Sequence, residues 1–233
     1  EDGIRVSVKL SKLCNLISKI RGLERIRYLT SHPNDIENDL INEHYTNKKL
    51  MPFLHLPIQS GSDRILKKMN RNHSRNDYIS LVRNIKSKIN NMAFSSDFIV
   101  GYPGETDYDF DQTIDLIEQV SFASSYSFKY SPRAGTQSSL KHLNVVNDNV
   151  SDLRLKKIQE ILNKQQSEFN FKFIDKNEEV LFTDKGKKNN QFVGRTKYLQ
   201  PVHVLCNRNI IGKKLEVNLE SLTSFSFHGK IIN

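Results

Sequence analysis

Four apolar segments alternate with amphipathic stretches in the first 130 residues of the chain. They span residues 25–29, 53–58, 94–100 and 125–130, and small polar residues follow most of them. Their starts lie 28 to 41 residues apart, which is the size of a strand joined to a helix. The pattern predicts successive parallel βα units, a fold in which ligand sites form where the strands end.

Between these segments, apolar residues recur at the three-and-four spacing of amphipathic helices. We expect helices near residues 10–20, 35–43, 65–69, 78–89 and 105–120. Acidic residues from Glu105 to Asp109 suit the start of a helix, where the helix dipole favours negative charge. Cys14 lies on the apolar stripe of the first helix, so we predict that it is a small buried hydrophobic residue.

A second region with a different pattern follows residues 144–152, which are rich in Asn and Asp and indicate a linker. A helix is expected from residue 152 onward. Five short β-rich runs come next, at residues 179–182, 191–198, 201–205, 215–219 and 225–232. Five strands in about 60 residues predict a small antiparallel barrel. We therefore divide the chain into an α/β region at 1–150, a connecting helix at 151–170 and a small β-barrel at 171–233.

The charge of the chain favours a polyanionic partner. Lys and Arg outnumber Asp and Glu by 35 to 26, and residues 171–233 alone hold 11 basic against 6 acidic residues. Basic residues of this last region gather in two short segments, as Lys185, Lys187 and Lys188 and as Arg195 and Lys197. Small barrels with basic and aromatic loops bind RNA through backbone charge and stacking, which predicts RNA contacts here. The alternative is that these lysines are solvated turn residues.

Several classes of chemistry lack their sequence signals. Cys14 and Cys206 are far apart and form no metal or disulfide pattern, and we assign no metal role to the seven histidines. No Ser-His-Asp order, phosphate-binding loop or paired-carboxylate arrangement stands out, so catalytic residues stay unassigned. No apolar run approaches the length of a membrane span, and we expect a cytoplasmic protein. The chain begins at Glu1 in the middle of an element, so we expect it to be a piece of a longer protein.

Candidate ligand residues follow the predicted strands. In Gln59-Ser60-Gly61-Ser62 the glycine allows close backbone approach and the polar groups can bond a ligand, although Ser62 can equally begin the next helix. Ser95, Ser96 and Asp97 form a polar triplet in a buried strand and need either protein partners or a ligand. Gly101 could lie against an adenine ring or simply form a turn, and Arg133 could hold an anion or be a solvated loop residue.

Five segments in the same order make the chain similar to a known family. It resembles the radical S-adenosylmethionine methylthiotransferases, essentially from end to end, in Thr30-Ser-His-Pro33, His55-Leu-Pro-Ile-Gln-Ser-Gly-Ser-Asp-Arg64, Ser96-Asp-Phe-Ile-Val-Gly-Tyr-Pro-Gly-Glu-Thr106, Tyr126-Ser-Phe-Lys-Tyr-Ser-Pro-Arg133 and Gly194-Arg-Thr-Lys-Tyr-Leu-Gln-Pro-Val-His203.

The resemblance implies a partial (β/α)6 barrel, of which this chain would hold the C-terminal two thirds, followed by a TRAM-type barrel that grips the anticodon stem-loop of tRNA. It implies S-adenosylmethionine and two 4Fe-4S clusters, an electron donor that reduces them, and methylthiolation of carbon 2 of N6-isopentenyladenosine beside the anticodon. One S-adenosylmethionine would be cleaved to a radical and another would supply the methyl group. By position, Gln59, Ser60 and Ser62 would line the cofactor and nucleoside pocket. Val100 and Gly101 would lie against the adenine, and Arg133 at the mouth, facing substrate.

The chain departs from the family in its cysteines. The CxxxCxxC motif of the radical cluster and the three N-terminal cysteines of the second cluster are absent, and neither Cys14 nor Cys206 occupies a ligand position. Ala134 also replaces a proline that the family usually has. We expect this chain to ligate no cluster, to be inactive alone and to be a monomer. The alternatives are an RNA-binding fragment without catalysis, or a sibling enzyme acting on threonylcarbamoyl-adenosine or on a ribosomal protein.

Overall fold

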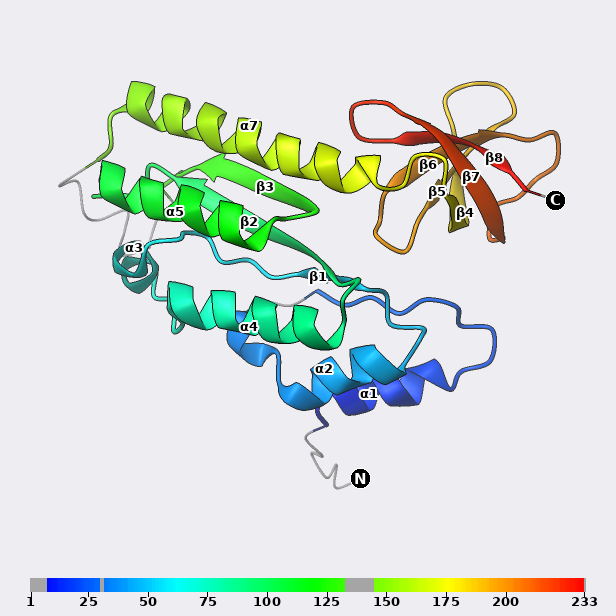
Figure 1. Cartoon of the computed structure of the whole chain (residues 1–233), viewed down its shortest axis with the longest axis horizontal. Coiled ribbons are helices and arrows are strands. Elements are labelled where there is room, and N and C mark those ends of the chain that lie inside the picture. The colour runs from blue at the N-terminus through cyan, green and yellow to red at the C-terminus, as the bar shows by residue number, and fades with distance from the viewer. Residues whose placement is uncertain (1–7, 30–31, 133–144, 233) are drawn as a thin grey trace, which may run out of the picture.

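The computed structural model of the chain describes residues 8–29, 32–132 and 145–232. It contains an α/β region and a small closed barrel, which the long helix α7 (Asp148–Phe171) connects (Figure 1). The chain enters the α/β region through α1 (Leu10–Ser18), the short helix η1 (Pro33–Asp35) and α2 (Asn38–Thr46). None of the helices in these described ranges is both long and apolar enough to cross a membrane.

Three parallel strands form the sheet of the α/β region, in the order β1 (Phe53–His55), β2 (Ala93–Val100), β3 (Ser124–Lys129). The expected strand at 25–29 is wrong as a strand, because this segment makes only one β-bridge, between Ile26 and Leu50. The side chains of Arg25 and Arg27 instead reach backbone carbonyls of the small barrel. The backbone of this segment pairs with residues 49–51 at Ile26, and its arginine side chains join it to the barrel.

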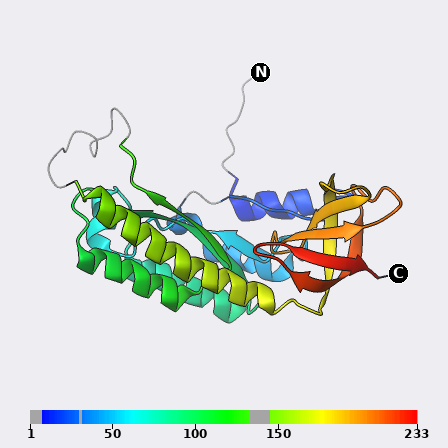
Figure 2. The ribbon, with the colours of Figure 1, turned by 90° about the horizontal axis from the view of Figure 1, so that it is seen from above.

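Helices cover one face of this sheet and leave much of the other open (Figure 2). The covering helices are α4 (Arg75–Lys88), α5 (Asp107–Val120) and α7, and the short helix α3 (Asp63–Lys68) follows β1. On the covered face Leu54, Phe94 and Phe98 are fully buried among helical apolar residues. Burial of each such side chain contributes roughly 1.5–3 kcal/mol, which accounts for the periodicity seen in the sequence. On the open face Tyr126 and Phe128 are exposed.

Local signals set the starts of the covering helices. Thr106 and Asp109 form a reciprocal capping box at the start of α5, and Ser74 and Asp77 form another at α4. Ser62 caps α3 by accepting a hydrogen bond from the backbone N–H of Ile65, which is the helix-start role, one of the two alternatives for this residue.

The C-terminal region is a closed five-stranded barrel, which confirms the predicted architecture. Its strands are β4 (Asn177–Lys185), β5 (Gln191–Arg195), β6 (Pro201–Leu205), β7 (Lys214–Leu222) and β8 (Phe227–Ile231). They close in the order β4-β5-β6-β8-β7, and all neighbours are antiparallel except β6 and β8, which run parallel. A glycine is required at position 194 in β5, because a Cβ atom there would lie 2.4 Å from Cγ1 of Val180 on the neighbouring strand β4.

The barrel docks at the amino ends of the sheet strands. Tyr198 packs against the rings of Phe169 and Phe173, close to the first residues of β1 and β2, and its hydroxyl donates to the carbonyl of Asn91 at 3.1 Å. Two arginines strengthen the contact: Nη1 of Arg25 donates to the carbonyl of Arg195, and Nη2 of Arg27 to that of Lys197, both at 2.7 Å. The carboxyl ends of the strands lie at the opposite end of the sheet and remain accessible.

Candidate cofactor and RNA-binding sites

A cavity of about 960 Å³ opens where the three strands end. Its size suits a cofactor or a nucleoside. Polar, aromatic and basic groups line it: Gln59, Lys67, Lys68, Met69, Asn70, Arg71, Asp97, Ile99, Tyr102, Phe128, Lys129, Tyr130 and Ser131. The position is the one that parallel α/β folds use for ligands.

Gln59 is the first residue of the predicted loop, and the structure places it in this cavity. Its backbone has a φ of 76°, a left-handed conformation that costs a non-glycine residue on the order of 1–3 kcal/mol. Two hydrogen bonds to β2 hold it there, from its N–H to the carbonyl of Asp97 and from the N–H of Ile99 to its own carbonyl, both 2.9 Å. The sheet therefore fixes the main chain of Gln59 at the edge of the cavity.

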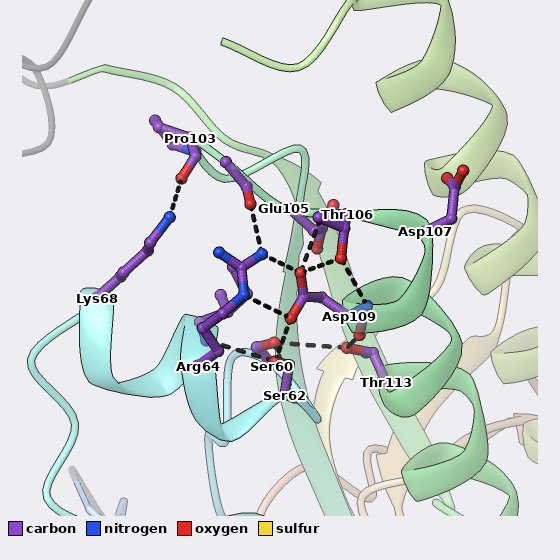
Figure 3. A network of polar contacts seen from close by, with 12 residues as sticks. Ser60, Ser62, Arg64, Lys68, Pro103, Glu105, Thr106, Asp107, Asp109 and Thr113 are labelled. Atoms are coloured by element: carbon purple, nitrogen blue, oxygen red, sulfur yellow. Dashed lines mark hydrogen bonds and ion pairs between the residues drawn. The ribbon is translucent and has the colours of Figure 1, made fainter. Parts of the chain in front are cut away.

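Ser60 and Ser62 are not among the residues that line the cavity, and Figure 3 shows them beside Asp109 and Thr113 of α5. Both are fully buried. The Ser62 hydroxyl donates to Oδ1 of Asp109 at 2.6 Å, and Ser60 Oγ lies 3.4 Å from the Thr113 hydroxyl. The structure therefore brings these two serines to α5, where they hold the loop in place. Their predicted contact with a cofactor stays a prediction.

Asp109 is the centre of this buried network (Figure 3). It is 2 % exposed and pairs with the guanidinium of Arg64, while Thr106 donates to it from both its hydroxyl and its backbone N–H. Burial alone would raise the pKa of Asp109, but the hydrogen bonds from Arg64, Ser62 and Thr106 outweigh burial and hold the pKa well below its usual range. The network joins the loop after β1 to the start of α5.

Val100 is the last residue of β2 and Gly101 follows it, and one main-chain group of each residue has a protein partner. The carbonyl of Val100 accepts from the N–H of Tyr130 at 2.9 Å, and the N–H of Gly101 donates to Oε2 of Glu105 at 2.7 Å. Glu105 is in turn paired with Arg154 of α7 at 2.7 Å. The Val100 carbonyl and the Gly101 N–H are therefore committed to protein partners, and the predicted contact of these two residues with an adenine stays a prediction.

The polar triplet of β2 has protein partners, which the sequence left undecided. Ser95 Oγ lies 2.8 Å from Nδ1 of His55, and the Ser96 hydroxyl donates to the carbonyl of Leu56 at 2.8 Å. Asp97 pairs with Nε2 of His55 at 3.5 Å and lines the cavity. Ser95 and Ser96 therefore hold β1 to β2, and Asp97 is the member of the triplet that a ligand can reach. Sequence reasoning did not select His55, because its partners lie 40 and 42 positions away.

The predicted RNA-binding residues fall into two groups. Lys185, Lys187 and Lys188 are exposed together at the turn between β4 and β5. Arg195 and Lys197 lie at the other end of β5, near the docking contact. Arg195 is exposed, whereas Lys197 pairs with Glu178 at 3.2 Å and lies over the ring of Tyr198. The substrate candidate Arg133 lies outside the described residues.

The two cysteines lie in different parts of the fold, one in the α/β region and one in the barrel. Cys14 is 2 % exposed and packs against Ile26 and Leu50, which confirms it as a buried hydrophobic residue, and Cys206 is a free, half-buried thiol. Within the part of the chain that the structure describes, no group of three or more His, Cys, Asp or Glu side chains could bind a metal ion.

Comparison with known proteins divides the chain in the same way as the structure. Residues 7–117 match the radical SAM superfamily, and residues 175–232 match the TRAM domain. The chain is 49% identical over 195 residues to proteins named tRNA-2-methylthio-N(6)-dimethylallyladenosine synthase from two strains of Ehrlichia ruminantium, Welgevonden and Gardel. It is 48% identical over 196 residues to the protein of the same name from Ehrlichia chaffeensis. Each comparison covers 84% of this chain, and the chain spans 44% of the length of each relative.

Proposed function

We propose that this chain, which contains radical SAM and TRAM domains, is the cofactor- and RNA-binding part of a tRNA methylthiotransferase. One observation carries the proposal: a ligand-sized cavity lies at the carboxyl end of the parallel sheet, and a basic closed barrel docks at its amino end. The chain that combines them is 49% identical to proteins named for tRNA methylthiolation. The reaction proposed for the whole protein is methylthiolation of carbon 2 of N6-isopentenyladenosine beside the anticodon. A cytoplasmic location and a monomeric state are further predictions.

The residues around the cavity fit S-adenosylmethionine. The Gln59 amide makes no hydrogen bond to any other described side chain and can bond the polar groups of the cofactor, while Phe128 and Tyr130 offer aromatic surface. When bound, S-adenosylmethionine supplies the radical and the methyl group of this chemistry. Val100 and Gly101 are proposed to lie against the adenine. Ser60 and Ser62 position the Gln59 loop through their hydrogen bonds to α5.

The residues described here do not fit an iron–sulfur cluster. Cluster ligation needs several thiolates in one place, and this chain has two cysteines in different domains. We therefore propose that both 4Fe-4S clusters, and the contact with an electron donor, belong to the length of the relatives that this chain does not span. On this proposal the chain binds cofactor and RNA but does not turn over by itself.

The cofactor arm of the proposal is tested by calorimetric titration with S-adenosylhomocysteine, the stable product analogue. We expect Gln59→Ala to weaken binding about five- to tenfold, the effect of losing one or two hydrogen bonds. Gln159→Ala, at an exposed position of α7, is the matched control and should leave the affinity unchanged. Equal affinities for the two variants would refute the assignment of Gln59.

The RNA arm is tested with a labelled tRNA anticodon stem-loop. Changing Lys185, Lys187 and Lys188 to Glu should abolish binding at moderate salt, because each lysine would neutralise a phosphate. A control with the same change of charge is Lys12, Lys19 and Lys156 to Glu, all exposed and on other elements. Stem-loops carrying isopentenyl-adenosine or threonylcarbamoyl-adenosine, and a ribosomal protein as competitor, would distinguish the proposed substrate from those of the sibling enzymes. Failure of the unmodified chain to bind any RNA would refute this arm.

A further inference from the structure

Four basic side chains line the cavity at the carboxyl edge of the sheet, and two of them are committed to protein partners. Lys129 pairs with Asp148 at 3.2 Å and with Asp152 at 2.8 Å. Lys68 donates to the carbonyl of Pro103 at 3.4 Å (Figure 3). These contacts give both cations a role in holding neighbouring segments together.

Lys67 and Arg71 differ from them. Neither has an ion pair or a side-chain hydrogen bond with any of the described residues, although they lie within five positions of each other at the same rim. Lys67 is exposed in the last turn of α3, and Arg71 follows that helix and is half-buried. Their charge is therefore available to a ligand, whereas the charge of Arg64 on the same helix is used by Asp109.

The backbone that carries these two cations is held firmly. The N–H of Arg71 donates to the carbonyl of Leu66 at 2.9 Å, and Asn70, with a φ of 57°, turns the chain between them. The hydroxyl of Tyr102 donates to the carbonyl of Lys68 at 2.9 Å and ties the end of α3 to the loop after β2. The cations thus project from a fixed turn, which lowers the entropy cost of binding an anion.

The cavity lining carries more positive than negative charge on this side. Its basic residues are Lys67, Lys68, Arg71 and Lys129 and its one acid is Asp97, and because Asp148 and Asp152 balance Lys129 the excess comes from the three residues at the end of α3. An excess of cations at the mouth of a cavity attracts a polyanion and keeps it at the rim. Phe128, exposed in the same lining, offers a face on which a base can stack.

We propose that Lys67 and Arg71 bind phosphates of the RNA backbone next to the nucleotide that enters the cavity. This second RNA contact rests on the proposed function, since it requires RNA as substrate. It lies at the opposite end of the sheet from the barrel, and Figure 1 shows α3 and the barrel at opposite ends of the molecule. The eight residues of β2 span about 25 Å. One nucleotide therefore cannot reach both the rim at Lys67 and Arg71 and the basic hairpin, which is the turn between β4 and β5 with Lys185, Lys187 and Lys188, whereas a folded stem-loop can.

The test measures the affinity of the full 233-residue chain for the labelled anticodon stem-loop over a range of salt concentrations. For Lys67→Gln with Arg71→Gln, we expect the slope of log affinity against log salt to fall by about 1.4–1.8, the loss of two phosphate contacts. Lys12→Gln with Lys156→Gln is the matched control and should keep the slope. Lys67→Gln alone, at an exposed position, should lower the slope by about half as much, which guards against a fold defect at Arg71.

Each remaining outcome is decisive. An unchanged salt slope for Lys67→Gln with Arg71→Gln would overturn the rim contact. If binding is still lost when the three hairpin lysines are changed to Glu, the proposed function stands. Weaker binding of S-adenosylhomocysteine together with an unchanged RNA slope would overturn the rim contact as well, because the rim would then hold the cofactor carboxylate. Absence of RNA binding by the unmodified chain would refute the proposed function and the rim contact together.

Discussion

Gly101 lies so close to Ser151 that a Cβ atom on Gly101 would sit 2.4 Å from the Ser151 hydroxyl oxygen. Gly101 directly follows the central strand β2, and Ser151 belongs to the first turns of α7, 50 positions later. The contact shows that the edge of the cavity and the helix leading to the barrel are packed as one unit. The sequence alone allowed Gly101 to be a ligand contact, whereas the structure shows that the packing of α7 requires a glycine at this position.

Gly101→Ala should destabilise the chain by about 2–4 kcal/mol, because the new methyl group meets Ser151 and the φ of 73° disfavours a side chain. Gly212→Ala is the matched control: Gly212 has a φ of 79° but open space around it, so only the backbone cost of about 1 kcal/mol applies. Denaturant unfolding measures both. If the two variants lose equal stability, the close contact with α7 does not exist in solution.

Arg154→Met should cost about 3–5 kcal/mol, since it leaves the Glu105 carboxylate buried without its cation. The side chains of Arg154 and Glu105 are 7% and 1% exposed. Lys129→Met breaks ion pairs with exposed Asp148 and Asp152 and should cost no more than about 1 kcal/mol. Thermal unfolding of the two variants checks the difference. Adding Glu105→Gln to Arg154→Met should recover part of the loss, and a further loss would contradict the assigned pairing.

Asp109 should make the chain sensitive to acid. Its pKa is depressed in the folded chain, so its stabilising contribution is complete above the ordinary Asp pKa of about 3.9 and is lost as pH falls toward the folded value. We expect unfolding free energy to fall more steeply between about pH 5 and pH 2 in the unmodified chain than in Asp109→Asn. Asp111→Asn, exposed on the same helix, should retain the steep fall. Parallel curves for all three proteins would contradict the buried network.

Arg27→Ala should loosen the barrel from the sheet. The lost hydrogen bonds run from a guanidinium to the carbonyls of Lys197 and Thr196, and bonds of this kind contribute about 1.5–3 kcal/mol. Hydrogen exchange should become faster at residues 91–93 and 196–199, where Tyr198 meets Asn91, while the barrel interior stays protected. Arg208→Ala, in an exposed barrel loop, serves as the control. Unchanged exchange in Arg27→Ala would show that the Arg27 hydrogen bonds are not needed to hold the barrel on the sheet.

Periodicity in the sequence predicted most of the secondary structure for a local reason. Apolar residues at every second or every third and fourth position can bury one face in only one kind of element, and capping residues such as Ser62 act within three positions of themselves. Cys14 was predictable on the same basis. The prediction of a strand at 25–29 was wrong because a local apolar pattern does not report whether a neighbouring strand is there to pair with, and this segment makes one bridge, from Ile26 to Leu50.

The sequence by itself determined the α/β region, the five strands of the barrel, the basic hairpin and the loop that begins at Gln59. Only the tertiary structure decided which polar side chains remain available: Ser60 and Ser62 turn to α5, Lys197 pairs with Glu178, and Lys67 and Arg71 keep uncommitted charges at the cavity. The physical reason is that burial patterns follow from neighbours along the chain. The partner of a charge or hydroxyl is set by distance in space, often between residues more than 40 positions apart.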